Sequence, residues 1–189
     1  LFKMARKKQY NEQVVIEKAM ALFWRNGYEN TSVRMLEKEM GINQFSIYAS
    51  FGNKQGVFLE SIKCYRKQIR QITDILENGK NGIKDIKDYF FNFLEFSKEN
   101  ACYKGCLVTN TVSELKSEEN PLIMKELLFF SNEIKQLFVR SLKQNDYEEV
   151  LIDKKANFLM NSLLGLSIAS KVYSTKELEE IIEMTFLNN

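Results

Sequence analysis

The chain has 189 residues, of which 44% are hydrophobic and 28% charged, a composition typical of folded globular domains rather than of disordered or fibrous proteins. It contains no histidine, which removes Ser-His and Cys-His nucleophile pairs and the commonest metal ligand. No run approaches the roughly 20 apolar residues of a membrane span, residues 1–10 lack the apolar segment of a secretion signal, and three cysteines are too few for a disulfide framework. We therefore expect a cytoplasmic protein that is not an enzyme and has no cofactor, no metal site and no membrane partner.

The charge is distributed unevenly along the chain, although the net charge is only +2. Residues 1–60 carry nine Lys and Arg against six Asp and Glu, whereas residues 61–189 carry eighteen against nineteen. A mildly basic first part followed by a neutral body indicates an anion-binding part and a second part with another role.

Three short helices are predicted first, because the chain has one proline, eight glycines and a helical apolar period almost throughout. They cover about residues 11–26, 33–40 and 44–50, and the second and third form a helix-turn-helix pattern around Gly41. Thr31 or Ser32 is expected to cap the second helix, and Asn43 the third. A long fourth helix begins near residue 53, with an apolar stripe that continues to residue 76.

Five further helices are predicted in the body, the fifth from residue 83, the sixth from Cys106 and the seventh from Pro121. The eighth, about residues 153–173, carries two apolar stripes, and the ninth begins at a capping box and ends near residue 186. One stripe of the eighth helix serves the core, and a second copy of the chain is the simplest cover for the other. We assign to this dimer interface the apolar residues Leu159, Leu163, Leu166, Ile181 and Ile182, although the pattern does not decide which stripe faces the partner.

The first three predicted helices and the start of the fourth contain a specific sequence motif. The stretch reads Ala19-x-x-Leu22-Phe23-x-x-x-Gly27-Tyr28-x-x-Thr31-Ser32-Val33-x-x-Leu36, and continues as Gly41-Ile42-x-x-x-Ser46-Ile47-Tyr48-x-x-Phe51-x-x-Lys54-x-x-Val57-Phe58. Over about residues 9–58 this closely resembles the DNA-binding head of the TetR family of bacterial transcriptional regulators. Beyond residue 60 the resemblance is architectural, apart from Gly105-Cys106-Leu107-x-x-Asn110, which is similar to a segment in one branch of the family.

The resemblance implies an all-α fold with two domains. A three-helix, helix-turn-helix DNA-binding head is expected over residues 9–55. A long fourth helix joins it to a helical effector-binding and dimerisation domain over residues 56–189. It also implies a homodimer that places two recognition helices in successive major grooves of a double-stranded DNA operator, and a repressor that is released from this operator by a small apolar effector.

Seven side chains of the head are candidates for DNA contact. Gln44 lies at the N-terminal end of the third helix, where it can pair with adenine through two hydrogen bonds, and Phe45 either touches a thymine methyl group or packs. The other candidates would reach phosphate oxygens: Thr31, Ser32, Ser46, Tyr48 and Lys54. Relatives often carry histidines where this chain has Ala49 and Ser50, which bears on affinity rather than on the mode of binding.

The aromatic residues of the body either fill a core or line an apolar pocket. For the pocket that the resemblance implies, we select the following candidates: Phe90, Phe93, Cys106, Asn110, Phe130 and Asn161.

Two alternatives remain open. Cys106, at a helix N-terminus and close to Lys104, has two features that favour a thiolate, so the chain is either a ligand-released repressor or a redox or electrophile sensor with Cys102 as a resolving thiol. The second alternative is a dimer of the same fold that serves as a protein-binding adaptor.

Overall fold

The chain folds as two compact units. A computed structural model describes residues 10–99, 102–116 and 118–187. The first unit ends at Cys64 and the second begins at Tyr65, inside the long helix α4 (Lys54–Asn78). The expected boundary at residues 55–56 lies near the start of this helix, so the compact units part about two turns later.

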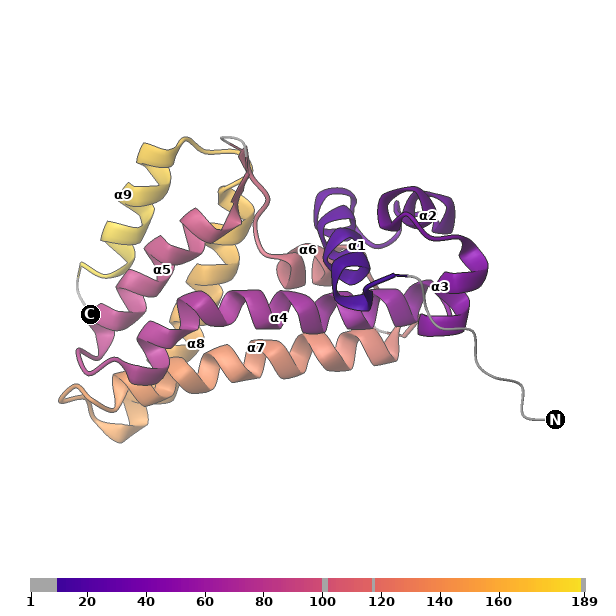
Figure 1. Cartoon of the computed structure of the whole chain (residues 1–189). Coiled ribbons are helices and arrows are strands. Elements are labelled where there is room, and N and C mark those ends of the chain that lie inside the picture. The colour runs from indigo at the N-terminus through magenta and orange to yellow at the C-terminus, as the bar shows by residue number, and fades with distance from the viewer. Residues whose placement is uncertain (1–9, 100–101, 117, 188–189) are drawn as a thin grey trace. The chain divides into compact units, whose positions relative to one another are not determined.

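The first unit contains three helices before α4 (Figure 1): α1 (Glu12–Asn26), α2 (Val33–Met40) and α3 (Gln44–Phe51). Each begins after a side chain that accepts hydrogen bonds from free backbone amides, namely Asn11, Ser32 and Asn43. Gly41 ends α2 at φ 71°, in the left-handed region that favours glycine. The three predicted helices and their turn are confirmed.

Apolar side chains of all four helices form the core of the first unit. Leu36 of α2 and Ile47 of α3 are fully buried. The rings of Phe23 on α1 and Phe58 on α4 meet edge to face, with centroids 4.8 Å apart. Ile47 therefore fixes one face of α3 against the core and leaves the opposite face outward.

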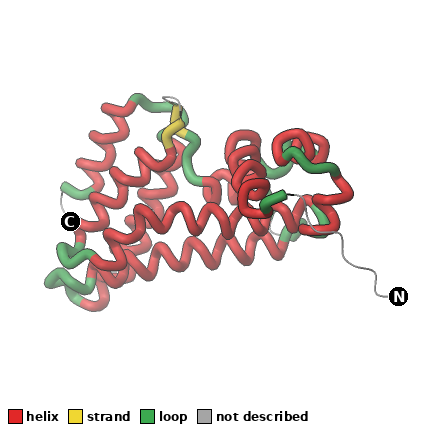
Figure 2. The backbone as a smooth tube through the Cα atoms, in the orientation of Figure 1, coloured by secondary structure: helices red, strands yellow, loops and turns green. Residues whose placement is uncertain are grey.

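The second unit contains the rest of α4 and seven further elements: α5 (Ile83–Ser97), β1 (Lys98–Glu99), β2 (Cys102–Tyr103), α6 (Leu107–Glu114), α7 (Pro121–Leu142), α8 (Glu149–Ala169) and α9 (Thr175–Thr185). Helix α7 packs against α5, α6 and α8, and α9 packs against α5 and α8. Figure 2 shows that helices make up nearly all of this unit, with the short strand pair as the exception among the described residues. Several large rings are fully buried here, including Tyr65, Tyr89, Phe90, Phe93 and Phe138.

Two features of the second unit differ from the prediction. Helix α8 covers residues 149–169 instead of 153–173, because the chain turns after Ala169, with the amides of Lys171 and Val172 bonded three residues back. The antiparallel pair β1–β2, in which Lys98 faces Tyr103, was not predicted, since two residues are too few for an alternating pattern.

No helix in the described part of the chain is both long enough and apolar enough to cross a membrane.

Candidate functional site

Helix α3 is held at its N-terminus by two side chains. Asn43 accepts a hydrogen bond from the amide of Ser46 at 2.9 Å, and the Glu37 carboxylate of α2 accepts one from the amide of Gln44. These bonds satisfy amides that the first turn of a helix leaves free. Together with the buried Ile47, they fix the direction in which the first turn of α3 points.

Four residues of α3 are exposed, namely Ala49 and three with larger side chains. Phe45 is 83% exposed, the largest fraction among the exposed large apolar residues, Tyr48 is 40% exposed, and Gln44 is also exposed. An apolar ring with so little protein contact contributes little to the folded core. The exposed face of α3 is therefore a candidate recognition surface that combines an amide, a ring and a phenol.

The two hydroxyls at the start of α2 have different roles. Thr31 is fully buried, and its hydroxyl donates to the Gly27 carbonyl at 2.6 Å. Ser32 is exposed and accepts a hydrogen bond from the Met35 amide at 3.2 Å, as the N-cap of α2. The expectation that Thr31 contacts DNA is therefore corrected, because its hydroxyl is used inside the unit, whereas Ser32 stays available at the surface.

Ser46 and Lys54 are both half-buried. The Lys54 ammonium donates to the Glu29 carbonyl at 3.3 Å and lies 4.4 Å from the centre of the Tyr28 ring. The Tyr10 hydroxyl, which the sequence did not single out, donates to the Ser46 carbonyl at 3.3 Å and lies 2.6 Å from the Ser50 hydroxyl. Tyr10 thus connects the segment before α1 to α3. The two residues are 36 positions apart, so no local sequence pattern predicts this contact.

A small buried cavity of about 30 Å³ lies in the second unit. Its lining comes from α4 to α8 and includes no charged residue. Three of the predicted pocket residues line it, namely Phe93, Cys106 and Phe130. A cavity of this size holds a water molecule or two but not a drug-sized ligand.

The other three predicted pocket residues lie elsewhere. Phe90 is buried against the rings of Phe138 and Phe186, with centroids 6.1 and 5.1 Å away. Asn110 donates to the Lys104 carbonyl at 2.9 Å, while its Oδ1 is buried without a partner. Asn161 is exposed on α8. These three are not part of the cavity lining.

Two buried tyrosines surround Cys106. The Tyr65 hydroxyl donates to the Cys106 sulfur at 3.3 Å, and the Cys106 amide donates to the Ser167 hydroxyl at 2.7 Å. Tyr89 lines the cavity and is 1% exposed. Burial raises the pKa of Tyr65 and the pKa of Tyr89 well above their ordinary value, and the nearby Cys106 thiol raises both further. Both phenols therefore stay neutral hydrogen-bond donors.

The side chain of Cys102 lies outside the described ones, so its expected role as a resolving thiol has no structural counterpart here.

The residues assigned to a dimer interface divide by burial. Leu159, Leu163 and Leu166 are 0%, 8% and 1% exposed, and Ile182 is fully buried, so these four pack inside the single chain. The assignment is corrected for them, because their stripe of α8 is the one that faces the core. Ile181 is at the surface. The other stripe is also exposed apart from the half-buried Met160, and its exposed residues and their continuation are Leu164, Ile168, Val172, Tyr173 and Met184.

Comparison with known proteins adds independent findings. Residues 15–61 match the family model described as bacterial regulatory proteins, tetR family. The chain is 26% identical over 179 residues to YezE of Bacillus subtilis (strain 168), an uncharacterized HTH-type transcriptional regulator, with 89% of this chain and 90% of that protein covered. It is 23% identical over 171 residues to IcaR of Staphylococcus aureus (strain Newman), the negative transcriptional regulator of the biofilm operon icaADBC, with 86% and 88% covered.

Two solved structures share the fold. A cysteine mutant of the TetR family transcriptional regulator CifR, complexed with 26-bp operator DNA, superposes with a TM-score of 0.86 at 24% identity, covering 97% of this chain and 99% of that chain. The reduced form of NemR from E. coli superposes with a TM-score of 0.77 at 18% identity, covering 93% and 94%. The family match lies over the helix-turn-helix, so residues 15–61 form a DNA-binding head of the TetR type, and the chain as a whole shares the fold of TetR family transcriptional regulators.

Proposed function

We propose that this protein is a homodimeric repressor that binds a DNA operator through α3 and is released by a small, uncharged and mainly apolar molecule. The observation that carries the proposal is the outward face of α3, where Gln44, Phe45 and Tyr48 are exposed on a helix fixed by Asn43 and Glu37. A recognition helix in the major groove contacts base edges through the residues near its N-terminus.

The exposed residues divide into base readers and phosphate contacts. Gln44 can accept from and donate to one adenine, and the Phe45 ring can cover a thymine methyl group. Tyr48, Ser46 and Lys54 carry groups that bind phosphate without reading sequence, and Ser32 adds a hydroxyl at the start of α2.

The dimer would form through the exposed apolar side chains of α8, of α9 and of the turn between them. Leu164, Ile168 and Val172 are 40%, 54% and 77% exposed, and Ile181 and Met184 extend the set. Such a group of apolar side chains at a surface is typical of a protein interface. A two-fold axis through this surface would bring together two copies of each residue.

The effector would enter the second unit at the buried cavity. The lining has no charged residue and includes Tyr89, whose neutral phenol can donate a hydrogen bond to a molecule with one carbonyl or ether oxygen. Because about 30 Å³ is too small for such a molecule, binding must move the surrounding helices. Helix α4 contributes to both units and is the element through which this movement would reach the head.

Release then follows from geometry and linkage. Two recognition helices must lie about 34–36 Å apart to enter successive major grooves. An effector that binds more tightly to the state in which the two recognition helices have a different separation weakens operator binding. The loss of binding free energy equals the difference in the effector's affinity for the two states, about 1–3 kcal/mol for ordinary allosteric coupling.

The experiment is binding of the purified protein to the duplex that flanks its own gene, compared with a scrambled duplex at two salt concentrations. We expect tight, sequence-dependent binding by a dimer, with a steep loss of affinity at higher salt. Gln44→Ala should cost about 1–3 kcal/mol at one operator position, whereas Lys54→Ala should weaken all duplexes alike and reduce the salt dependence. Binding that never exceeds that of random DNA, for the flanking duplex and for duplexes selected from a random pool, would reject the regulator in favour of the adaptor function.

One observation favours a second candidate for the signal. The Cys106 sulfur lines the cavity and accepts the Tyr65 hydroxyl hydrogen bond, which places a donor beside a nucleophile. An α,β-unsaturated carbonyl compound could alkylate it: a sulfur–carbon bond forms at the β-carbon, and the thiol proton ends on the α-carbon. A mass increase equal to the whole reagent on Cys106, with loss of operator binding that Cys106→Ser prevents, would support this candidate, and reversible release without a mass change would exclude it.

A further inference from the structure

A second space lies beside the buried cavity. It is a groove of about 320 Å³ between the second-unit part of α4 and α7. Its lining combines apolar side chains with charged ones, among them Arg66, Arg70 and Glu133. A space of this volume is large enough for a small organic molecule.

One layer of side chains separates the groove from the cavity. Ile69, Phe130 and Ile134 line both spaces, and they are 2%, 5% and 4% exposed. Phe130 has the largest side chain of the three, and its ring centroid lies 6.0 Å from that of Tyr65, whose hydroxyl bonds to Cys106. Moving the Phe130 ring would therefore connect the groove to the place where Cys106 lies.

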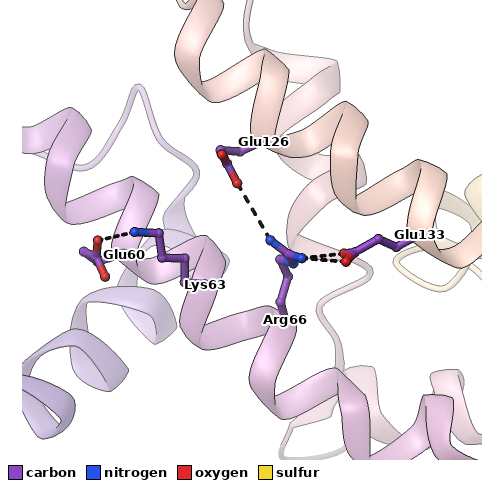
Figure 3. Close-up of polar contacts among 5 residues, drawn as sticks. All are labelled: Glu60, Lys63, Arg66, Glu126 and Glu133. Atoms are coloured by element: carbon purple, nitrogen blue, oxygen red, sulfur yellow. Dashed lines mark hydrogen bonds and ion pairs between the residues drawn. The ribbon is translucent and has the colours of Figure 1, made fainter.

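An ion pair joins α4 to α7 (Figure 3), and both of its residues line the groove. Arg66 of α4 donates to both oxygens of the Glu133 carboxylate on α7, at 2.7 and 2.6 Å, and a second carboxylate of α7, that of Glu126, lies 3.8 Å away. One guanidinium nitrogen, Nη2, contacts both oxygens, and the Arg66 and Glu133 side chains are 21% and 41% exposed, so the pair is partly shielded from solvent. It links α4 to α7 next to Ile69, Phe130 and Ile134, the side chains that line both spaces.

We propose that the groove is the outer chamber of the effector site and that Phe130 is the side chain that closes the inner chamber. This proposal rests on the function proposed above. The effector that would occupy both chambers has an apolar end and a polar end. Its uncharged apolar end displaces Phe130 and enters the inner cavity, which has no charged lining residue, while its polar end stays in the groove beside Arg70. Passage between the helices strains the Arg66–Glu133 pair, which links arrival of the effector to the position of α4.

The inner chamber contains its own reporter, the buried thiol of Cys106, so the route is testable without knowledge of the effector or the operator. The full-length protein is treated with two neutral thiol reagents of different size, methyl and benzyl methanethiosulfonate, and the modification of Cys106 is followed by peptide mass spectrometry. The variants are Phe130→Ala and Phe93→Ala. Both remove a buried phenylalanine from the cavity lining, but only Phe130 also lines the groove.

We expect Phe130→Ala to accelerate labelling by about tenfold or more, which corresponds to about 1.4 kcal/mol in the free energy of opening, and to accelerate the benzyl reagent more than the methyl reagent. Phe93→Ala should change either rate far less, because it enlarges the cavity without opening its wall toward the groove. If either variant fails to fold, the same comparison is made with Phe130→Leu and Phe93→Leu.

Equal acceleration by the two variants would overturn the proposal, since access would then follow general loosening of the core. Equal acceleration of both reagents in Phe130→Ala would also overturn it, since the change would then lie in the reactivity of the thiol. Because no DNA is present, failure here leaves the operator-binding proposal standing, and failure of operator binding leaves this result interpretable.

Discussion

Replacement of Phe45 by alanine tests whether this residue contributes to the stability of the fold or to DNA recognition. The ring is 83% exposed on α3, so its removal should change the free energy of unfolding by no more than about 0.5 kcal/mol, as for other surface substitutions. If the ring covers a thymine methyl group in the operator, the same change should weaken DNA binding clearly.

The magnitude of this contact can be estimated from the group that it buries. A methyl group removed from water contributes about 0.8 kcal/mol, which is a factor of about 4 in the dissociation constant. Truncation of the whole ring also loses contact with the sugar and the neighbouring base. We therefore expect the total loss for Phe45→Ala to lie between about 1 and 2 kcal/mol, or about 5- to 30-fold.

The assay is a double-mutant cycle with chemistry on the DNA. Operator duplexes selected from a random pool are synthesised with thymine or with deoxyuridine at single positions, a change that removes only the 5-methyl group. Dissociation constants of the wild-type protein and of Phe45→Ala are measured by fluorescence anisotropy. At one position the wild-type protein should lose about fourfold in affinity for deoxyuridine, and Phe45→Ala should lose nothing further.

Two outcomes would refute the reasoning. Equal losses for both proteins at every thymine would show that the ring does not contact a methyl group. An unchanged affinity of Phe45→Ala for the thymine operator would show that the ring lies outside the interface.

Three further predictions concern the corrected residues and the buried phenols. Thr31→Val should lower stability by about 1 kcal/mol in urea unfolding, because the bond to the Gly27 carbonyl is lost, and should leave the salt dependence of DNA binding unchanged; a reduced salt slope would return Thr31 to the interface. Ile168→Glu should convert the dimer to a folded monomer in analytical ultracentrifugation, whereas Leu163→Ala should remain dimeric and lose about 2–5 kcal/mol of stability; a dimeric Ile168→Glu would place the interface elsewhere. Burial holds the pKa of Tyr89 above its ordinary 10.0, so the folded state keeps a proton that the unfolded chain loses, and stability should be full below pH 10 and fall as the pH rises beyond it. Tyr89→Phe should flatten that fall in unfolding experiments at alkaline pH, and an unchanged slope would count against the effect of burial.

Local chemistry made the head predictable. Caps at Ser32 and Asn43 and a left-handed glycine at position 41 act within a few residues, so helix limits and the turn between α2 and α3 follow from sequence alone. The outward position of Gln44 and Phe45 follows from the same local rules, since Ile47 must face the core.

The second unit required the tertiary structure. An amphipathic stripe shows that a face is buried, but not whether its cover comes from the same chain or from another. Helix α8 has two such stripes, and only the packing of the unit around α7 shows that Leu159, Leu163 and Leu166 are internal, which leaves Leu164 and Ile168 outside.

The sequence by itself therefore determined the helical class, the helix-turn-helix and the recognition face, because each depends on contacts between near neighbours along the chain. The tertiary structure alone decided which aromatic residues surround a cavity, that Tyr65 and Tyr89 flank Cys106, and that Arg66 ties α4 to α7. The Tyr65–Cys106 and Arg66–Glu133 contacts join residues 41 and 67 positions apart, and their existence depends on how several helices pack at once.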